Sequence, residues 1–205
     1  MNFKLSDEQN LLRDQARKLS VEVFKDRAAR WDVNAEVPWD NIKVLAEQGY
    51  LGLLIPEEYG GGGGSIVDLA LVLEQFAWSC VSTALYVFSS NVHANRIAQL
   101  GDAAQRAKYL PGIANGSILP AHAMSEPQAG SDAKRLLTSA TLQGDNYVVN
   151  GAKCWISRGA VAHVFLVDVV FKQGQEGTQE KEGKKEHGML LMERDTPGFE
   201  VGKVE

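Results

Sequence analysis

The sequence contains few cysteines and no paired histidines, and both shortages limit its chemistry. Two cysteines, Cys80 and Cys154, lie far apart in a chain of 205 residues. They are too few for a disulfide scaffold or a zinc site, so we expect reduced thiols. None of the four histidines has another histidine four residues away, the spacing at which a helix offers two metal ligands. The sequence therefore predicts no metal site.

The sequence also lacks long apolar segments and clusters of basic residues. No stretch of about 18 residues is entirely apolar, and the N-terminus has no apolar signal core. These absences predict a cytoplasmic chain that neither crosses a membrane nor is exported. The formal net charge of -5, with no block of Lys or Arg, disfavours nucleic acids and anionic membranes as partners.

Apolar residues are abundant, at 44% of the chain, which is enough to bury a sizeable core in one or two domains. In residues 1–116 they recur mostly at helical spacing, so we predict an all-α N-terminal domain there. Capping residues predict helix starts at Ser6, Ser65 and Asp102. A short helix is expected between Pro38 and Gly49.

Three further features of this half give specific expectations. The runs 65–78 and 83–100 are largely apolar and predict two buried helices. The helix that begins at Asp102 is expected to stop at Pro111. The five consecutive glycines at 60–64 favour no regular element and predict a mobile connection. No Lys followed by Ser or Thr comes after them, which argues against a phosphate-binding loop.

The apolar period changes from about four to two after Ser117, which predicts an antiparallel β domain over residues 117–205. Strands are expected within 137–157, at 162–171 and at 188–195, with tight turns at Gly144 to Asn146 and at Asn150 with Gly151. Residues 172–187 contain no apolar side chain and predict a solvated hairpin loop. The fold class is therefore α+β, with a helical domain before a sandwich-like or barrel-like β domain.

Two segments of the β half have residue types suited to binding. AMSEPQAGSD, from Ala123 to Asp132, combines hydroxyls, carboxylates and Gly130, and such a loop presents main-chain N–H groups to an anion or to the edge of a heterocycle. In the strand predicted over 154–157, alternation places Trp155 and Ser157 on one face, which suits a stacked ring. The alternatives are an ordinary turn and a core tryptophan.

Five motifs in order resemble the acyl-CoA dehydrogenase family. They are IPEEYGG (55–61), YLPGIANG (109–116), MSEPQAGSD (124–132), NGAKCWIS (150–157) and DTPGFEVGK (195–203). The resemblance extends along the whole chain and implies an FAD flavoprotein fold of a helical domain, a middle β domain and a C-terminal four-helix bundle. The chain would then end before that bundle.

The resemblance implies which residues contact the flavin and the substrate. Ala123, Met124 and Ser125 would line the flavin ring, with His122 at the start of the segment. Trp155 and Ile156 would flank the ring, and Ser157 would donate a hydrogen bond near N5, the atom that receives hydride. Ser131 would lie among the cofactor contacts and near the acyl-CoA thioester. Ser125 and Ser157 stand where Thr is usual, and Arg158 where Asn is usual.

The reaction that the resemblance implies is α,β-dehydrogenation of an acyl-CoA thioester, in which a carboxylate removes the α proton. Family members carry that glutamate in the C-terminal bundle, and no carboxylate here matches it, so we expect this chain alone to bind flavin weakly and to be inactive. Electron transfer flavoprotein as the oxidant and a homotetramer are implied as well. An acyl-CoA oxidase, a nitroalkane oxidase, a flavin monooxygenase or a non-catalytic scaffold are the alternatives.

Overall fold

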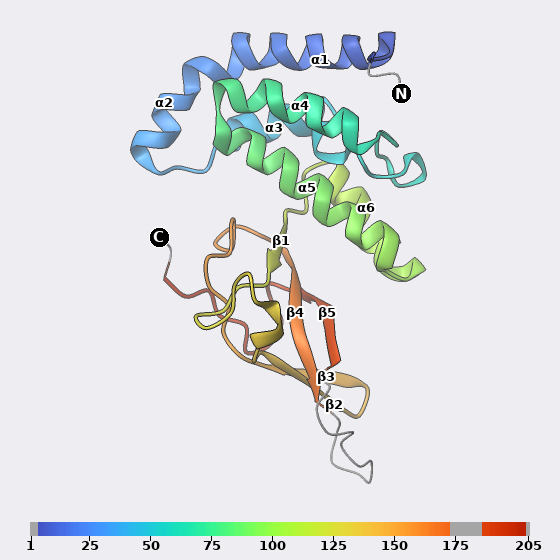
Figure 1. The fold of residues 1–205 in the computed structure, drawn as a ribbon, viewed down its shortest axis with the longest axis vertical. Helices are drawn as coiled ribbons and strands as arrows, with labels where there is room; N and C mark the ends of the chain where they lie inside the picture. Colours follow the sequence, from blue (N-terminus) through green and yellow to red (C-terminus); the bar gives the residue numbers. More distant parts are fainter. Residues whose placement is uncertain (1–3, 173–185, 204–205) are drawn as a thin grey trace. The chain divides into compact units, whose positions relative to one another are not determined.

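The computed structural model describes residues 4–172 and 186–203, and the chain forms two compact units, Met1–Leu119 and Pro120–Glu205. Figure 1 shows the first unit as a set of helices and the second as a β-sheet with long loops. The predicted order of a helical part followed by a β part is therefore confirmed. The domain boundary after residue 116 stays a prediction. Most of the hairpin loop predicted at 172–187 lies outside the described residues.

The described part of the first unit consists of α-helices joined by short turns. These helices are α1 (Asp7–Leu19), α2 (Lys25–Asn34), α3 (Trp39–Glu47), α4 (Ile66–Ser79), α5 (Val81–Leu100) and α6 (Ala103–Ala114). A π-helical turn, Ser20–Phe24, joins α1 to α2, and 3-10 turns occur at Tyr50–Gly52 and Glu57–Tyr59. None of the helices in the described ranges is long and apolar enough to cross a membrane.

Side-chain caps begin three of these helices, as the sequence predicts. Gln9 N–H donates to the Ser6 hydroxyl at 3.1 Å, Asp68 N–H to the Ser65 hydroxyl at 3.3 Å, and Gln105 N–H to the Asp102 carboxylate at 2.8 Å. Each bond satisfies an N–H group that would otherwise have no acceptor in the first helical turn. The core of the unit includes Phe76 of α4, which makes edge-to-face contacts with Phe24 and Tyr50.

The five-glycine segment is more ordered than the predicted mobile connection. It folds back on the preceding turn, where Gly62, Gly63 and Gly64 donate their N–H groups to main-chain oxygens of residues 52, 55 and 53 at 2.8–3.0 Å. A side chain at Gly61 would collide with the Ile55 carbonyl, so glycine permits this close approach. The glycine content indicates a backbone with many accessible conformations, but it does not reveal the main-chain hydrogen bonds that select one of them.

One prediction about the helices in this unit is wrong, and a second is confirmed only in part. Helix α6 continues past Pro111 to Ala114, and it ends where Gly116 adopts a φ of 78°. Proline costs the helix one hydrogen bond, and packing of the buried Leu110 and Ile113 retains the helix nonetheless. Helices α4 and α5 are not buried all round either. Their exposed apolar side chains include Ile66, Val67, Trp78, Val81, Leu85 and Phe88.

The described part of the second unit contains one five-stranded sheet. Its strands are β1 (Pro120–Ala123), β2 (Ser139–Gln143), β3 (Asn146–Asn150), β4 (Val164–Lys172) and β5 (Glu186–Glu193). Strand β4 is central: β1 pairs with its first half, β2 with its end, and β5 along its other edge. The hairpin of β2 and β3 turns at residues 144–145, close to the predicted turn.

The sheet is mixed, which corrects the prediction of a purely antiparallel domain. Strands β1 and β2 both run parallel to β4, whereas β2–β3 and β4–β5 are antiparallel. A parallel pair needs a long connection between its strands, and residues 124–163 provide one between β1 and β4. The alternation of apolar residues reports which face is buried but not the direction of a neighbouring strand.

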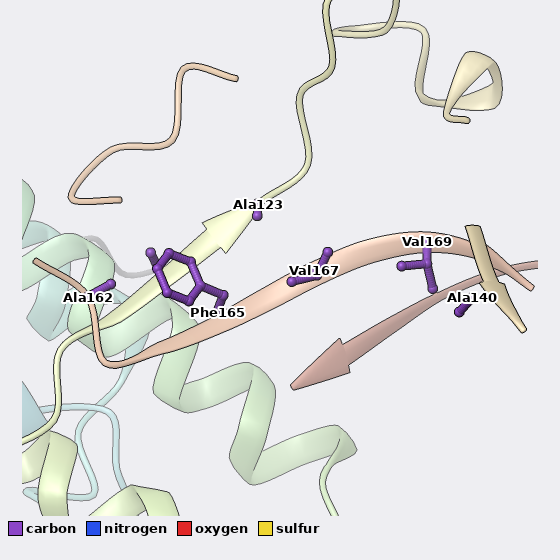
Figure 2. Packing of buried hydrophobic residues seen from close by; sticks show 7 residues of the cluster. Ala123, Ala140, Ala162, Phe165, Val167 and Val169 are labelled. Atoms are coloured by element: carbon purple, nitrogen blue, oxygen red, sulfur yellow. The ribbon is translucent and has the colours of Figure 1, made fainter. Parts of the chain in front are cut away.

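Alternate residues of the sheet form its core. Figure 2 shows Phe165, Val167 and Val169 of β4 with Ala123 of β1 and Ala140 of β2. The other members of this cluster are Ala121 and Ala162. Small alanines on the neighbouring strands leave room for the larger side chains of β4. The strand β1 is thereby fixed, and the segment that follows it starts from a rigid position.

Candidate functional site

The first segment of the site is a tight turn directly after β1. Glu126 and Ala129 exchange two main-chain hydrogen bonds, at 2.8 Å and 3.0 Å, around Pro127 and Gln128. Ala129 is buried against Leu136 and Val170, which anchors the far side of the turn to the sheet. The opening residues of the segment, Met124 and Ser125, are therefore held between β1 and this turn.

A buried carboxylate organises this segment. The Glu126 side chain is 2% exposed, and its oxygens accept hydrogen bonds from the N–H groups of Leu137 (2.8 Å) and Thr138 (3.0 Å) and from the Gln128 amide. The Lys153 ammonium lies 2.8 Å from its Oε1. Burial raises the pKa of Glu126, but these hydrogen bonds outweigh burial and lower the pKa to about 2. The carboxylate is therefore ionised and neutralised by Lys153 at neutral pH.

The second segment corrects the predicted strand over 154–157. Strand β3 ends at Asn150, and residues 151–156 follow it as an irregular loop. Trp155 has a φ of 58°, the left-handed region, so strand alternation does not place Trp155 and Ser157 on one face. The chain leaves the sheet because the polar groups of Lys153 and Cys154 bond to the first segment instead of to β2.

The two segments lie side by side. Cys154 N–H donates to the Ser125 carbonyl oxygen at 2.9 Å, and the Lys153 ammonium donates to the Met124 carbonyl oxygen at 3.0 Å. Residues that are 29 positions apart in the sequence thus form one surface. The structure therefore brings Met124 and Ser125 next to the residue that precedes Trp155.

The predicted site residues occupy different environments. Trp155 is 76% exposed, Ser157 is exposed, and Ser125 is half-buried. The side chains of Ala123 and Ile156 pack on the core of the sheet, which leaves their main-chain atoms for any contact with a ligand. Ser131 is exposed and follows the buried Ala129 by two residues, and no bond described here joins it to the second segment.

His122 is directed to the opposite face of the sheet from Ala123, because side chains alternate along β1. Its Nε2 lies 2.9 Å from an Asp168 carboxylate oxygen on β4. Both side chains are partly buried, at 19% and 23% exposed. The histidine side chain is therefore occupied by this pair, and its main chain is the part that adjoins the first segment.

Three residues of this arrangement were not among the predicted contacts. They are Glu126, Lys153 and Asp168, each of which holds a predicted residue or its neighbour in place. In the sequence, Lys153 stands out only as the single charged residue of the run NGAKCWIS. Glu126 stands out only by its position between Ser125 and Pro127. Neither signal identifies its partner, since the two residues come from distant parts of the chain.

The surface suits a flat heterocycle with polar edges. Trp155 presents an exposed indole from a left-handed backbone position, which is a strained conformation for a bulky residue. Exposed aromatic rings bind other rings by stacking, and the hydroxyls of Ser125 and Ser157 offer hydrogen bonds at the rim. The buried charges of Glu126 and Lys153 compensate each other. The residues present therefore fit the isoalloxazine of FAD.

Comparison with known proteins gives matches along the chain. The model of the acyl-CoA dehydrogenase N-terminal domain matches residues 6–117, and that of the middle domain matches residues 121–205. A probable acyl-CoA dehydrogenase, YngJ, of Bacillus subtilis is 34% identical and is matched over 98% of this chain and 52% of the relative. The acryloyl-CoA reductase (NADH) of Anaerotignum propionicum is 35% identical, over 100% and 51%. The chain spans about half the length of these relatives.

Solved structures share the fold. A glutaryl-coenzyme A dehydrogenase in complex with glutaryl-CoA superposes with a TM-score of 0.89 at 28% identity, covering 100% of this chain and 51% of that one. A chain in the structure of the electron transferring flavoprotein of Acidaminococcus fermentans gives a TM-score of 0.89 at 30% identity, over 100% and 52%. At 23% identity, a glutaryl-CoA dehydrogenase of Mycobacterium smegmatis in complex with FADH2 shows the fold alone, with a TM-score of 0.86 and 98% and 49% covered. Because domain models of one family match both the helical and the β unit, the chain belongs to the acyl-CoA dehydrogenase family.

Proposed function

We propose that the protein takes part in FAD-dependent α,β-dehydrogenation of an acyl-CoA thioester, and that this chain contributes the surface that faces the flavin. The observation that carries the proposal is the 2.9 Å bond from Cys154 N–H to the Ser125 carbonyl. It joins two segments that the family resemblance assigns separately to the flavin. The exposed indole of Trp155 follows directly on that bond.

Each residue of the surface has a separate task in this proposal. The main chain of His122 to Ser125 and the Ser125 hydroxyl line one side of the ring, and the Trp155 indole covers part of the ring by stacking. Ile156 contributes main-chain contacts, and the Ser157 hydroxyl donates to the ring edge. When bound, FAD supplies the redox chemistry by accepting two electrons. The rigid β1 and the buried Glu126 keep these contacts in place.

The proposal assigns no catalytic base among the described residues. Glu126 directly follows the predicted flavin contact Ser125, but its four hydrogen bonds and its pKa of about 2 make it a poor proton acceptor at neutral pH. Its role is structural. The base required for removal of the α proton is therefore sought elsewhere in the whole protein.

The substrate and the partners are proposals as well. Ser131, exposed beside the anchored turn, would contact the thioester part of acyl-CoA. The fold is shared with a dehydrogenase solved with glutaryl-CoA and with a chain in a structure of an electron transferring flavoprotein, which supports acyl-CoA as the substrate and such a flavoprotein as the electron acceptor. A homotetramer and a cytoplasmic location also stay proposals.

Anaerobic mixing of the full-length protein, loaded with FAD, with a series of acyl-CoA thioesters tests the proposed function. We expect loss of the flavin absorbance band with a subset of thioesters, and transfer of the electrons to an added electron transfer flavoprotein or dye. Bleaching by a nitroalkane but by no thioester would replace the proposal with a nitroalkane oxidase. Rapid reoxidation by oxygen, without acceptor, would indicate an acyl-CoA oxidase. Absence of any reduction would favour a non-catalytic scaffold.

A further inference from the structure

Lys153 makes two contacts that link the predicted flavin segments. Its ammonium lies 2.8 Å from Glu126 Oε1 and 3.0 Å from the Met124 carbonyl oxygen. The lysine side chain is 9% exposed and that of the glutamate 2% exposed. One buried ammonium therefore connects the loop that carries Trp155 to both the main chain and a side chain of the segment after β1.

The glutamate end of this link is fixed independently of Lys153. Glu126 accepts from the N–H groups of Leu137 and Thr138, and Thr138 directly precedes β2. Its own main chain is paired with Ala129, which packs on the sheet. The ammonium thus attaches the loop 151–157 to a point that the rest of the unit already holds.

Stability alone gives a weak reason for this buried pair. Taking two charges out of water is costly, and well-packed apolar side chains of similar volume are often no less stable. An apolar pair would, however, lack a donor for the Met124 carbonyl oxygen. That directional bond acts with the bond from Cys154 to Ser125 to set the register of the two segments.

We propose that Lys153 is a positioning residue for the cofactor: its buried ammonium holds the Met124–Ser125 main chain and the Trp155 loop at the separation that FAD requires. The inference rests on the proposed function, because it names FAD as the group that the surface receives. It goes beyond that function in assigning a task to a residue that makes no contact with the ring. Preorganisation of this kind raises affinity by removing the cost of ordering a loop on binding.

The experiment compares the full-length protein with the double variant Glu126→Gln/Lys153→Met and with the control Lys134→Met. Lys134 is an exposed lysine of the same unit, in the 3-10 turn Ala133–Arg135. The double variant removes both charges together, so no unpaired charge stays buried. Three quantities are measured: the unfolding midpoint in urea, the Kd for FAD, and amide hydrogen exchange of residues 151–157 without FAD.

We expect the double variant to unfold near the wild-type midpoint while its Kd for FAD rises about tenfold, as for other residues that orient a direct contact. Exchange at the Cys154 N–H should accelerate, because its acceptor on Ser125 is no longer held in register. Lys134→Met should change none of the three. A double variant with the wild-type Kd and wild-type exchange overturns the proposal.

The exchange measurement separates this inference from the proposed function. If the wild-type protein binds no FAD, the proposed function fails, and the role of Lys153 toward FAD fails with it. Faster exchange at Cys154 in the double variant would then show only that Lys153 positions the loop. If the double variant does not fold, Lys153→Met alone is used, since Glu126 then still accepts from the main chain at 137 and 138 and from the Gln128 amide. A Kd within about twofold of wild type in that variant contradicts the proposal.

Discussion

The main-chain N–H of Cys154 donates to the carbonyl oxygen of Ser125 at 2.9 Å, and this bond decides where Trp155 lies. The loop that follows β3 leaves the sheet where this bond forms, and Trp155, the residue after Cys154, has a φ of 58°. A large aromatic side chain is consequently exposed on a segment whose ends are fixed, by Cys154 on one side and by the packing of Ile156 on the other. Such a ring is preorganised for stacking.

Replacement of this indole should weaken cofactor binding. We predict that Trp155→Ala raises the Kd for FAD by roughly tenfold, because stacking of aromatic rings contributes about 1 kcal/mol beyond the area buried. Trp39→Ala is the matched control, since Trp39 is another exposed tryptophan, 50% exposed, on the helical unit. Flavin fluorescence titration of both variants checks the prediction. Equal affinities in the two variants would remove Trp155 from the site.

The backbone conformation of Trp155 should itself be measurable. A residue with a side chain pays for the left-handed region, whereas glycine adopts it freely. We therefore predict that the free energy of unfolding of Trp155→Gly equals that of Trp155→Ala or exceeds it by up to about 1 kcal/mol. At most other positions the glycine variant would be the less stable one. Urea unfolding of the two variants without FAD measures the difference. A clearly less stable glycine variant would show that the loop does not hold this conformation.

Local sequence signals identified most elements of the helical unit. Capping residues such as Ser6 and Ser65 act within one turn of their own helix, so their effect can be read from neighbouring positions. The predicted helix stop at Pro111 is wrong because packing, not the local sequence, decides where this helix ends. The local penalty of the proline is real, but the complete burial of its neighbours Leu110 and Ile113 outweighs it.

The site was harder to predict than the fold because its geometry depends on distant pairs. The family resemblance predicted two segments that contact flavin, and the structure places these two segments side by side. Their junction, however, is made by Lys153 with Glu126 and by Cys154 with Ser125, pairs separated by 27 to 29 positions. Alternation assigned Trp155 to a strand, since a run of β-forming residues does not reveal that its N–H groups have acceptors outside the sheet.

The buried glutamate should make the stability of the protein depend on pH. The pKa of Glu126 in the folded chain is lowered to about 2, from about 4.5 for a glutamate in the unfolded chain. Because the pKa is lower in the folded than in the unfolded chain, ionised Glu126 stabilises the native state at pH values above about 4.5. This stabilisation is lost as the pH falls from about 4.5 through about 2. We predict that the gap in unfolding free energy between wild type and Glu126→Gln narrows by roughly 2–3 kcal/mol over this range. Urea unfolding at steps between pH 6 and pH 2 measures the gap, and a constant gap contradicts the prediction.

The end of α6 offers a test of packing with an internal control. Gly116 and Gly60 have similar φ values, 78° and 82°, but a Cβ at Gly116 would lie 2.8 Å from the Ala46 Cβ, whereas a Cβ at Gly60 would meet nothing within 4 Å. Both alanine variants incur the left-handed strain, about 1 kcal/mol. We predict that Gly116→Ala costs a further 1–3 kcal/mol, roughly, from overpacking. Thermal unfolding of both variants measures the difference, and equal losses would show that α3 yields to the added methyl group.

The two exposed serines of the proposed site should affect different steps. Ser157 follows Trp155 by two residues and is proposed to donate to the flavin edge, whereas Ser131 lies beyond the anchored turn and is proposed to contact acyl-CoA. In the full-length enzyme, Ser131→Ala should therefore raise the KM for acyl-CoA about fivefold with the FAD content unchanged, since a lost hydrogen bond to substrate weakens binding by about 1 kcal/mol. Ser157→Ala should instead lower kcat or the FAD content with little change in KM. Steady-state kinetics and flavin absorbance of both purified variants separate the two effects. If both serines alter KM and leave the flavin untouched, Ser157 belongs to the substrate surface, because a hydroxyl that donates to the cofactor cannot be removed without changing how the cofactor is held.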